Sequence, residues 1–335
     1  EKENMKVMKV WLVALCGVTV LSACGGGTVK KEKKSDLAEM FMNGKVKELT
    51  EHTEGATSSQ TYKFNESGYI TEVSQTDVRS NKNTVLVKNE YDEKGKLVAT
   101  CFYNSMDGGL QRKQAFNADG NITEELDFSR NYSGEGGEFI VSGRRLYKYD
   151  EKGLLISSWS ENNEQNRSEY ECDAAGNTLK RTDYYQDEPS LILSNSYKYD
   201  GDGNITEEVK YFQELPKRKD KDLKAGEIEQ KTVRKFNGKG QQTEETIYYY
   251  EFDTKQKKSV PLRRQTLTCD YTDFDAILKS VYTTYKYKDG EEEKVSEKII
   301  DCVYLLDDHN NWTSMDNQMD NETVNTVNRT ITYYE

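Results

Sequence analysis

Three features of the sequence predict an all-β protein: a short turn motif that recurs along most of the chain, period-two alternation between the turns, and a composition rich in tyrosine. The 335 residues include 23 Tyr and 10 Phe but only 3 Pro, and 32% are charged. Aromatic residues are enriched in strands and scarce in disordered chains. With a mean hydropathy of −0.93, this composition favours strands that have one wet face.

The charge balance is acidic. Lys and Arg number 47 against 59 Asp and Glu, which gives a formal net charge of −12 at pH 7. A field of this sign repels phosphate backbones, so we expect no nucleic-acid partner.

The first residues have the pattern of a secretory signal. Lys6 and Lys9 precede an apolar run over residues 10–20. That run is shorter than the roughly 20 apolar residues that a spanning helix needs, so we expect it to be a targeting segment that is removed before folding.

The end of this segment carries a second signal. The residues Leu21-Ser22-Ala23-Cys24 resemble the bacterial lipobox, and the resemblance implies that Cys24 is lipidated and becomes the first mature residue. The alternative is a plain secretory signal with a cysteine there by chance. We therefore expect a signal over residues 1–23, and then a lipidated tether with a possible short helix over residues 24–43.

The rest of the chain, residues 44–335, repeats one turn motif: an aromatic residue, Asp or Asn, two variable residues, Gly, and an apolar residue two positions later. The seven clear copies place the Asp or Asn and the Gly at Asn65 and Gly68, Asp92 and Gly95, Asn117 and Gly120, Asp150 and Gly153, Asp173 and Gly176, Asp200 and Gly203, and Asn237 and Gly240. Two degenerate copies hold Asp275 and Asn310 at the glycine position.

The chemistry of the motif predicts a tight β-hairpin. An Asp or Asn side chain can accept hydrogen bonds from backbone N–H groups further along, and Gly supplies a positive φ, which Asp and Asn also tolerate. Nine or ten hairpins give about 18–20 strands, and a sheet of that width cannot stay flat. We expect one long antiparallel meander, curled into an open shell or a barrel-like single sheet.

Alternation from each turn predicts which residues share a face. Tyr199 should pair with Ile205, and simple alternation then places Tyr197 and Val209 on the same apolar, inward face, with Glu208 on the other. The same parity places Cys101, Cys172, Cys269 and Cys302 on the apolar face, where we expect free thiols, although disulfides stay open. It also places Glu124 and Glu207 on the inward side, as carboxylates among apolar residues.

The motif resembles the YD repeat, also called the RHS repeat, of bacterial envelope and toxin proteins. The shape Tyr-x-Tyr-Asp-x-x-Gly-Asn-Ile is met best at residues 197–205, and the resemblance covers roughly residues 60–335. The terminal turn at Asn311-Trp312-Thr313 resembles the closing repeat of small YD-repeat lipoproteins. The resemblance implies a lipoprotein of the cell envelope but supplies no activity.

No catalytic motif stands out. The chain has two His, no zinc-type or nucleophile motif, and no phosphate-binding loop. We therefore expect no catalytic residue, no metal site and no cofactor. The leading hypothesis is a non-enzymatic lipoprotein, held to the outer membrane through Cys24 on its periplasmic or surface face, that binds or scaffolds a protein or glycan. The alternative is an envelope glycan hydrolase that uses unidentified carboxylates.

Overall fold

The computed structural model describes residues 35–130, 138–216, 224–288 and 290–335. Within them, 20 strands form one antiparallel sheet, and a short helix, α1 (Asp36–Glu39), precedes the first strand. The predicted all-β meander is confirmed. The expected signal segment, Cys24 and the first part of the tether lie outside the described residues.

The strands follow one another along the chain. Their bounds are β1 (Val46–Thr53), β2 (Ser58–Phe64), β3 (Ile70–Asp77), β4 (Asn83–Tyr91), β5 (Leu97–Tyr103), β6 (Leu110–Phe116), β7 (Ile122–Arg130), β8 (Phe139–Tyr149), β9 (Leu155–Ser160), β10 (Asn163–Cys172), β11 (Thr178–Tyr185), β12 (Glu188–Tyr199), β13 (Ile205–Tyr211), β14 (Ile228–Phe236), β15 (Gln242–Asp253), β16 (Lys258–Tyr271), β17 (Ile277–Lys288), β18 (Glu291–Leu306), β19 (Trp312–Met319) and β20 (Glu322–Tyr333).

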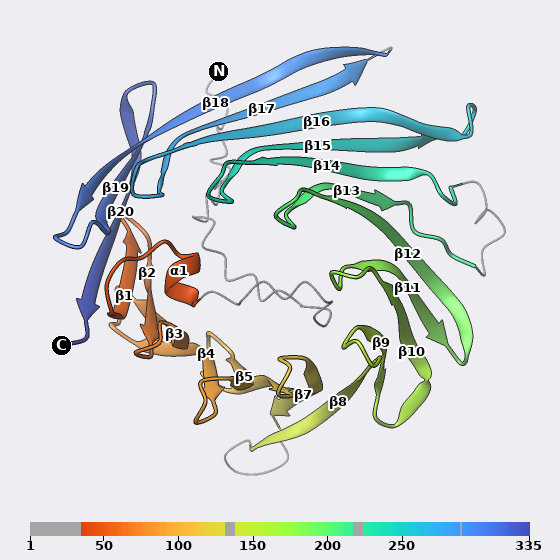
Figure 1. Cartoon of the computed structure of the whole chain (residues 1–335), viewed down its shortest axis with the longest axis horizontal. Helices are drawn as coiled ribbons and strands as arrows, with labels where there is room; N and C mark the ends of the chain where they lie inside the picture. Colours follow the sequence, from red (N-terminus) through yellow and green to blue (C-terminus); the bar gives the residue numbers. More distant parts are fainter. Residues whose placement is uncertain (1–34, 131–137, 217–223, 289) are drawn as a thin grey trace.

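The sheet closes on itself. Each strand pairs with the next, and β1 also pairs antiparallel with β20, with Leu49 opposite Ile331 and Glu51 opposite Arg329. Figure 1 shows the result as a ring of strands in which β1 and β20 lie side by side. The fold is therefore a closed 20-stranded barrel rather than an open shell.

Helix α1 lies on the inner side of the ring, against β1–β3 (Figure 1). The Ser35 hydroxyl caps it by accepting a hydrogen bond from the Ala38 N–H at 3.2 Å. Its Leu37 packs with residues of β1–β3 and the segment before them, in a cluster of Met42, Val46, Leu49, Tyr62, Phe64, Ile70 and Val73. We call the face of the sheet that carries this cluster the inner wall, and the opposite face the outer wall.

Nine connections at one end of the barrel, the turn end, share one geometry, and each spans five residues, such as residues 200–204. In that copy the Asp200 carboxylate accepts hydrogen bonds from the N–H groups of Asp202 and Asn204, at 3.0 and 2.8 Å, and Gly203 has a φ of 79°. In the degenerate copies, Asp275 and Asn310 have φ values of 67° and 60°.

A β-bulge after each turn corrects the predicted faces. Tyr199 pairs with Ile205 as predicted, but Lys198 then pairs with Glu207, so Thr206 is the extra residue. Alternation shifts by one position beyond it, and Glu208 lies opposite Tyr197 on the inner wall. The prediction that Val209 shares a face with Tyr197 is therefore wrong, since Val209 lies on the outer wall.

The bulge recurs with the same chemistry. In five copies a threonine at the bulge donates its hydroxyl to a backbone carbonyl of the facing strand: Thr71 to Lys63, Thr123 to Ala115, Thr206 to Lys198, Thr243 to Lys235 and Thr313 to Leu305. In these five bulges the extra residue therefore has a hydrogen-bond partner for its side chain.

Tyrosine hydroxyls tie each repeat to the one before it. The tyrosine at or near the end of one repeat donates to the carbonyl at the start of the second strand of the preceding repeat: Tyr91 to Ile70, Tyr149 to Ile122, Tyr197 to Thr178, Tyr271 to Gln242 and Tyr304 to Ile277. At one repeat a cysteine stands in the tyrosine position, and the Cys172 Sγ lies 3.5 Å from the Leu155 carbonyl oxygen.

None of the four described cysteines forms a disulfide bond. Cys172, Cys269 and Cys302 lie on the inner wall, but Cys101 pairs with Lys88 and Lys113 on the outer wall. The predicted inward position of Cys101 is wrong because Val98 forms the bulge of its strand. Among the described residues, no helix has the length and apolar character needed to cross a membrane.

Candidate functional site

The predicted turn residues shape the loops of the turn end. In the fifth clear copy, Asp173 accepts N–H hydrogen bonds from Ala175 and Asn177, and its second oxygen accepts the hydroxyl of Tyr199 from the next hairpin. Asp307 accepts the hydroxyl of Tyr333 in the same way at the seam of the barrel. The carboxylates of Asp173 and Asp307 therefore hold the turns in place through these hydrogen bonds.

The inner wall beyond β4 is polar. Direct pairing places Arg112 and Gln114 of β6 opposite Asp127 and Glu125 of β7, and the row continues from Glu125 to Arg145 of β8. The side chain of Arg112 is 47% exposed, so water reaches this wall. A wall of this kind suits a hydrophilic ligand rather than a packed core, because uncompensated polar groups are costly to bury.

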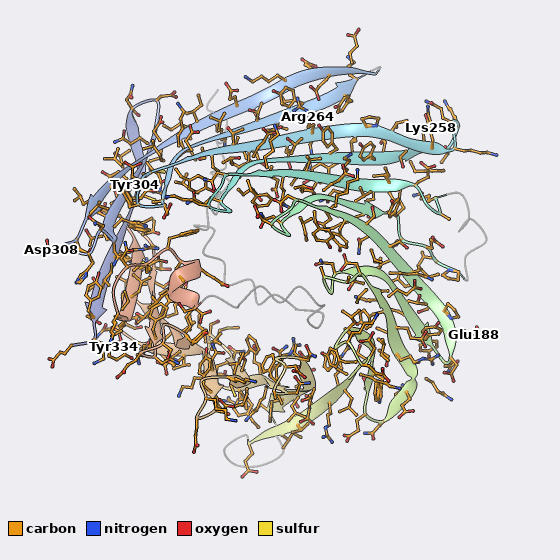
Figure 2. The ribbon with its side chains drawn as sticks, viewed as in Figure 1. Glu188, Lys258, Arg264, Tyr304, Asp308 and Tyr334 are labelled. Atoms are coloured by element: carbon orange, nitrogen blue, oxygen red, sulfur yellow. The ribbon has the colours of Figure 1, made fainter. Side chains whose placement is uncertain are left out.

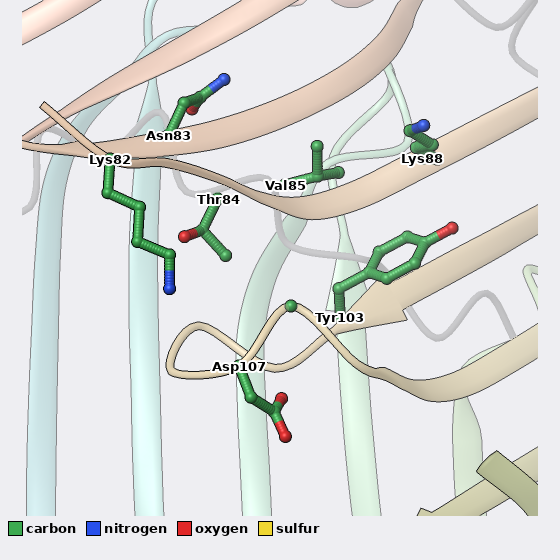
Figure 3. Close-up of a pocket in the computed structure, with 8 residues that line it drawn as sticks. Lys82, Asn83, Thr84, Val85, Lys88, Tyr103 and Asp107 are labelled. Atoms are coloured by element: carbon green, nitrogen blue, oxygen red, sulfur yellow. The ribbon is translucent and has the colours of Figure 1, made fainter. Parts of the chain in front are cut away.

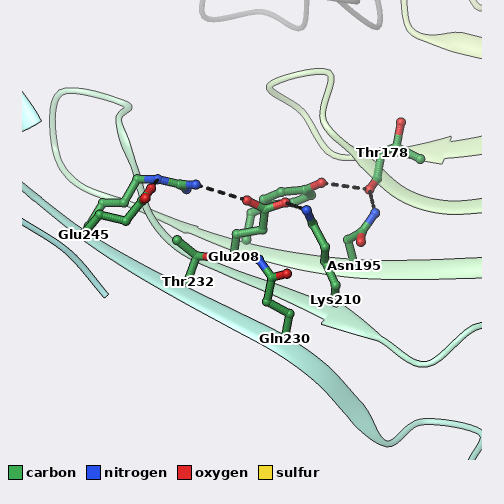
Figure 4. A network of polar contacts seen from close by, with 9 residues as sticks. Thr178, Asn195, Glu208, Lys210, Gln230, Thr232 and Glu245 are labelled. Carbon is green, nitrogen blue, oxygen red and sulfur yellow. Dashed lines mark hydrogen bonds and ion pairs between the residues drawn. The ribbon is translucent and has the colours of Figure 1, made fainter. Parts of the chain in front are cut away.

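A connected network covers the inner wall across β12–β15 (Figure 4). The Arg234 guanidinium lies between two carboxylates, 2.8 Å from Glu245 and 3.4 Å from Glu208. Glu208 is also 3.5 Å from the Lys210 ammonium. Amide and hydroxyl groups complete the surface, since Gln230 donates to Thr232 at 3.2 Å and Asn195 donates to the Thr178 carbonyl at 3.1 Å.

A second cluster lies on β10 and β11. Asp183 accepts hydrogen bonds from the Arg181 guanidinium and, at 2.7 Å, from the Ser168 hydroxyl. Burial acts to raise the pKa of Asp183, but the hydrogen bonds from Arg181 and Ser168 outweigh it and hold this pKa below the usual range. Asp183 is thus held as the ionised partner of Arg181.

The outer wall carries a ladder of ion pairs. Glu207 lies 2.8 Å from Lys198 and 2.7 Å from Lys231, and these two hydrogen-bonded ammonium groups lower the pKa of its carboxyl. Glu124 pairs with Arg144. The predicted inward position of both glutamates is wrong, because each follows a threonine bulge and lies on the outer wall. Figure 2 shows side chains on both sides of the ribbon throughout the ring.

A shallow depression lies at the far end of the barrel, opposite the turn end, between the connections of β3–β4 and β5–β6 (Figure 3). Thr84, Val85, Tyr103 and Asp107 are among its lining residues. Lys82 spans it by donating to the Met106 carbonyl at 3.4 Å. The depression is open and small compared with the inner wall.

Metal ligands do not cluster within the described ranges: no group of three or more His, Cys, Asp or Glu side chains could hold a metal ion there. His309 lies in a turn and stacks on Tyr333, with ring centroids 4.1 Å apart. The His309 ring therefore packs at the seam of the barrel, against β20.

Comparisons with known proteins give no family. No protein-family model and no curated protein matches the chain. Among solved structures, it is similar to a porin-like protein from Bacteroides uniformis, at 12% identity over 87% of this chain and 98% of that one, with a TM-score of 0.31. A second is the Photorhabdus luminescens Tc holotoxin pore, at 10% identity over 82% of this chain, with a TM-score of 0.32.

The coverage of these structures differs. This chain spans 14% of the toxin chain. A DUF3836 family protein from Bacteroides vulgatus is matched over 98% of its own length but over 32% of this chain, at 13% identity and a TM-score of 0.21. At TM-scores this low, none of these likenesses bears on function.

The inner-wall polar residues were not predicted from the sequence. Simple alternation from the turn placed Glu208 and Lys210 on the opposite face. The available signal is the threonine three residues after the glycine position in five repeats, because an extra residue at that position exchanges the two faces of the strand.

Proposed function

We propose that this protein is a non-enzymatic lipoprotein of the cell envelope whose inner wall binds a glycan. The observation that carries the proposal is the network of Arg234, Glu208, Glu245 and neighbouring amides on the inner wall (Figure 4). Sugars present many hydroxyl groups, each a donor and an acceptor. Carboxylates, guanidinium groups and amides arranged as a surface offer matching partners.

Tyrosines support the choice of a glycan. Tyr147, Tyr170, Tyr249 and Tyr282 stand on the inner wall among the polar residues. An aromatic ring with a polar hydroxyl packs against the C–H face of a sugar while it keeps a hydrogen bond. Tyr282 is 40% exposed and therefore open to such a contact.

The state of the carboxylates supports binding over hydrolysis. A glycosidase acid needs a raised pKa so that it is protonated at the working pH. Glu208 and Glu245 each contact Arg234, and the pKa of Asp183 lies below its usual range despite burial, because Arg181 and Ser168 donate hydrogen bonds to it.

The lipid anchor of the proposal rests on the sequence Leu21-Ser22-Ala23-Cys24. Cells that express the full chain are labelled with a clickable palmitate analogue. Wild type should take up label and Cys24→Ala should not. Equal labelling of both would show that the anchor is wrong.

The glycan function is tested with the lipid-free chain on a glycan array, followed by calorimetry with the best binder. Glu208→Gln on the inner wall should weaken binding, whereas Glu207→Gln, the adjacent residue on the outer wall, should leave it unchanged. The same glycan is incubated with the chain and assayed for reducing ends. Release that is lost in Glu208→Gln would replace the binding function with a hydrolase.

A further inference from the structure

Two consecutive arginines of β16 face opposite walls and stack on tyrosines. The Arg263 guanidinium lies over the Tyr249 ring at 4.3 Å on the inner wall, and the Arg264 guanidinium lies over the Tyr285 ring at 3.9 Å on the outer wall. Stacking on an aromatic face holds a guanidinium plane in one orientation. Both arginines are therefore held in place by the same kind of contact.

They differ in their counter-charge. Arg264 donates from Nε and Nη2 to both carboxylate oxygens of Glu292, at 2.8 Å each. Arg263 has no carboxylate within 4.0 Å in the part of the chain that the structure describes. On the same inner wall, Arg112, Arg181, Arg234 and Arg329 each pair with a carboxylate.

The surroundings add a second cation. Lys286 of β17 stands directly opposite Arg263 and is exposed, and it has no ion pair among the described residues. Two carboxylates lie on the same wall of the neighbouring strands: Glu293, opposite Lys286, and Glu251, two positions beyond Tyr249. The Tyr249 hydroxyl donates to the Gln265 side chain at 3.1 Å, which fixes the ring beneath Arg263.

An exposed aromatic ring completes the arrangement. Tyr282 lies on the same wall of β17, four residues before Lys286, and is 40% exposed. Burial raises the pKa of Tyr282, and the charges of Tyr249, Arg263 and Glu245 also act on its hydroxyl. Glu245 lies in the same row of the sheet, since it is opposite Leu267, which is opposite Tyr282.

We propose that Arg263 and Lys286 bind the carboxylate of a uronic-acid saccharide, with Tyr282 against the face of a sugar ring. The proposal rests on the proposed glycan function and names the class of glycan. A guanidinium group with free N–H donors matches a carboxylate with two parallel hydrogen bonds. Because arginine stays protonated, the charge is available at every physiological pH.

The experiment compares a hexamer of galacturonic acid with the methyl ester of the same hexamer, by calorimetry on the lipid-free chain. The two probes share hydroxyl groups and rings and differ in charge. Wild type should bind the acid at least about tenfold tighter than the ester, a preference of about 1.4 kcal/mol. Arg263→Met should remove this preference by weakening acid binding more than ester binding, whereas Arg264→Met should keep it.

Lys286→Met is the second variant, because Lys286 is exposed and its ammonium group has no ion pair within the described residues. It should reduce the acid preference in the same direction. Added salt should reduce the preference as well, since the interaction is partly exposed. Retention of the full preference in both Arg263→Met and Lys286→Met would overturn the inference.

Wild-type binding separates this inference from the function on which it rests. Equal binding of acid and ester overturns the uronate site but leaves a neutral-glycan function standing. Binding of neither hexamer overturns the inference too, and an array on which no glycan binds removes the proposed function with it.

Discussion

The two ends of the barrel differ in the connections between their strands. At the turn end, nine connections of five residues repeat one set of hydrogen bonds. At the far end, the connections range from residues 186–187 to residues 212–227. The connection of residues 186–187 has positive φ values at Gln186 and Asp187, 54° and 62°, without a glycine.

The difference shows where register is specified. The residues of a turn-end connection specify its conformation locally, because an Asp or Asn side chain and a Gly define its backbone. A far-end connection joins strands that belong to two different turn-end hairpins, each of which has its own register, so its length can vary at modest entropic cost. Substitutions of the same type should therefore be more harmful at the turn end.

The largest expected effect is at a turn-end glycine. Gly203→Val places a β-branched residue at a φ of 79° and should destabilise the protein by about 1–3 kcal/mol. Gly226→Val also changes a residue with a positive φ, 77°, but Gly226 lies outside the nine repeated turns, so its effect should be smaller. The urea midpoint of unfolding measures the destabilisation in both variants.

Gly201→Val is the control within the same turn as Gly203, since the space around Gly201 is open and its φ is not in the positive region. It should change the midpoint least of the three. If Gly226→Val costs as much as Gly203→Val, the two ends do not differ as described. If Gly201→Val does so, the turn geometry itself is wrong.

A tyrosine tie should give the next largest effect. Burial strongly raises the pKa of Tyr304, and its hydroxyl donates to the Ile277 carbonyl beside a turn. Tyr304→Phe removes that hydrogen bond and should cost about 1 kcal/mol in the free energy of unfolding.

Tyr282→Phe is its control, because the Tyr282 hydroxyl has no hydrogen bond among the described residues and the ring is 40% exposed. Thermal melts of the two variants should differ clearly. Melts that coincide with wild type in both cases would mean that the ties between repeats add nothing to stability.

Much of this fold can be predicted from the sequence, and the reason is local. Asp200 and Gly203 define their turn with atoms that lie within five residues, so the pairing of Tyr199 with Ile205 follows. The number of strands follows from counting turns. Closure of β1 on β20 depends on contacts between distant segments, and the motif alone leaves an open shell possible.

The candidate site could not be predicted in this way. The unpaired state of Arg263 depends on two bulges. The bulge at Leu278 sets which residues of β17 face Arg263, and the bulge at Val295 places Glu292 on the outer wall. A single misplaced residue exchanges the walls, as it did for Glu207 and Val209. The polar inner wall becomes visible only once every bulge is placed.

The smallest expected effect concerns pH. Hydrogen bonds from Lys198 and Lys231 lower the pKa of Glu207 in the folded protein. Its stabilising contribution is therefore present above the unfolded value, about 4.3, and is lost as the pH falls through the lower folded value. Glu207→Gln should cost a few tenths of a kcal/mol at pH 7, as is usual for exposed pairs, and nothing near pH 2.

Glu297→Gln sharpens this test. Lys294 lowers the pKa of Glu297 as well, but its side chain is 39% exposed against 18% for Glu207. Urea midpoints across pH 2–7 should show a smaller pH-dependent difference for this variant. If the difference in urea midpoint between variant and wild type stays constant across this pH range, the effect does not arise from ionisation of the carboxylate.

Closure of the ring has a consequence for self-assembly. Every hairpin of this chain resembles its neighbours, so an open array would end in strand edges that match strands of any other copy. Exposed edges of that kind template fibres. By pairing β1 with β20, the chain satisfies both edges internally, and a repetitive sequence that could polymerise stays a discrete particle.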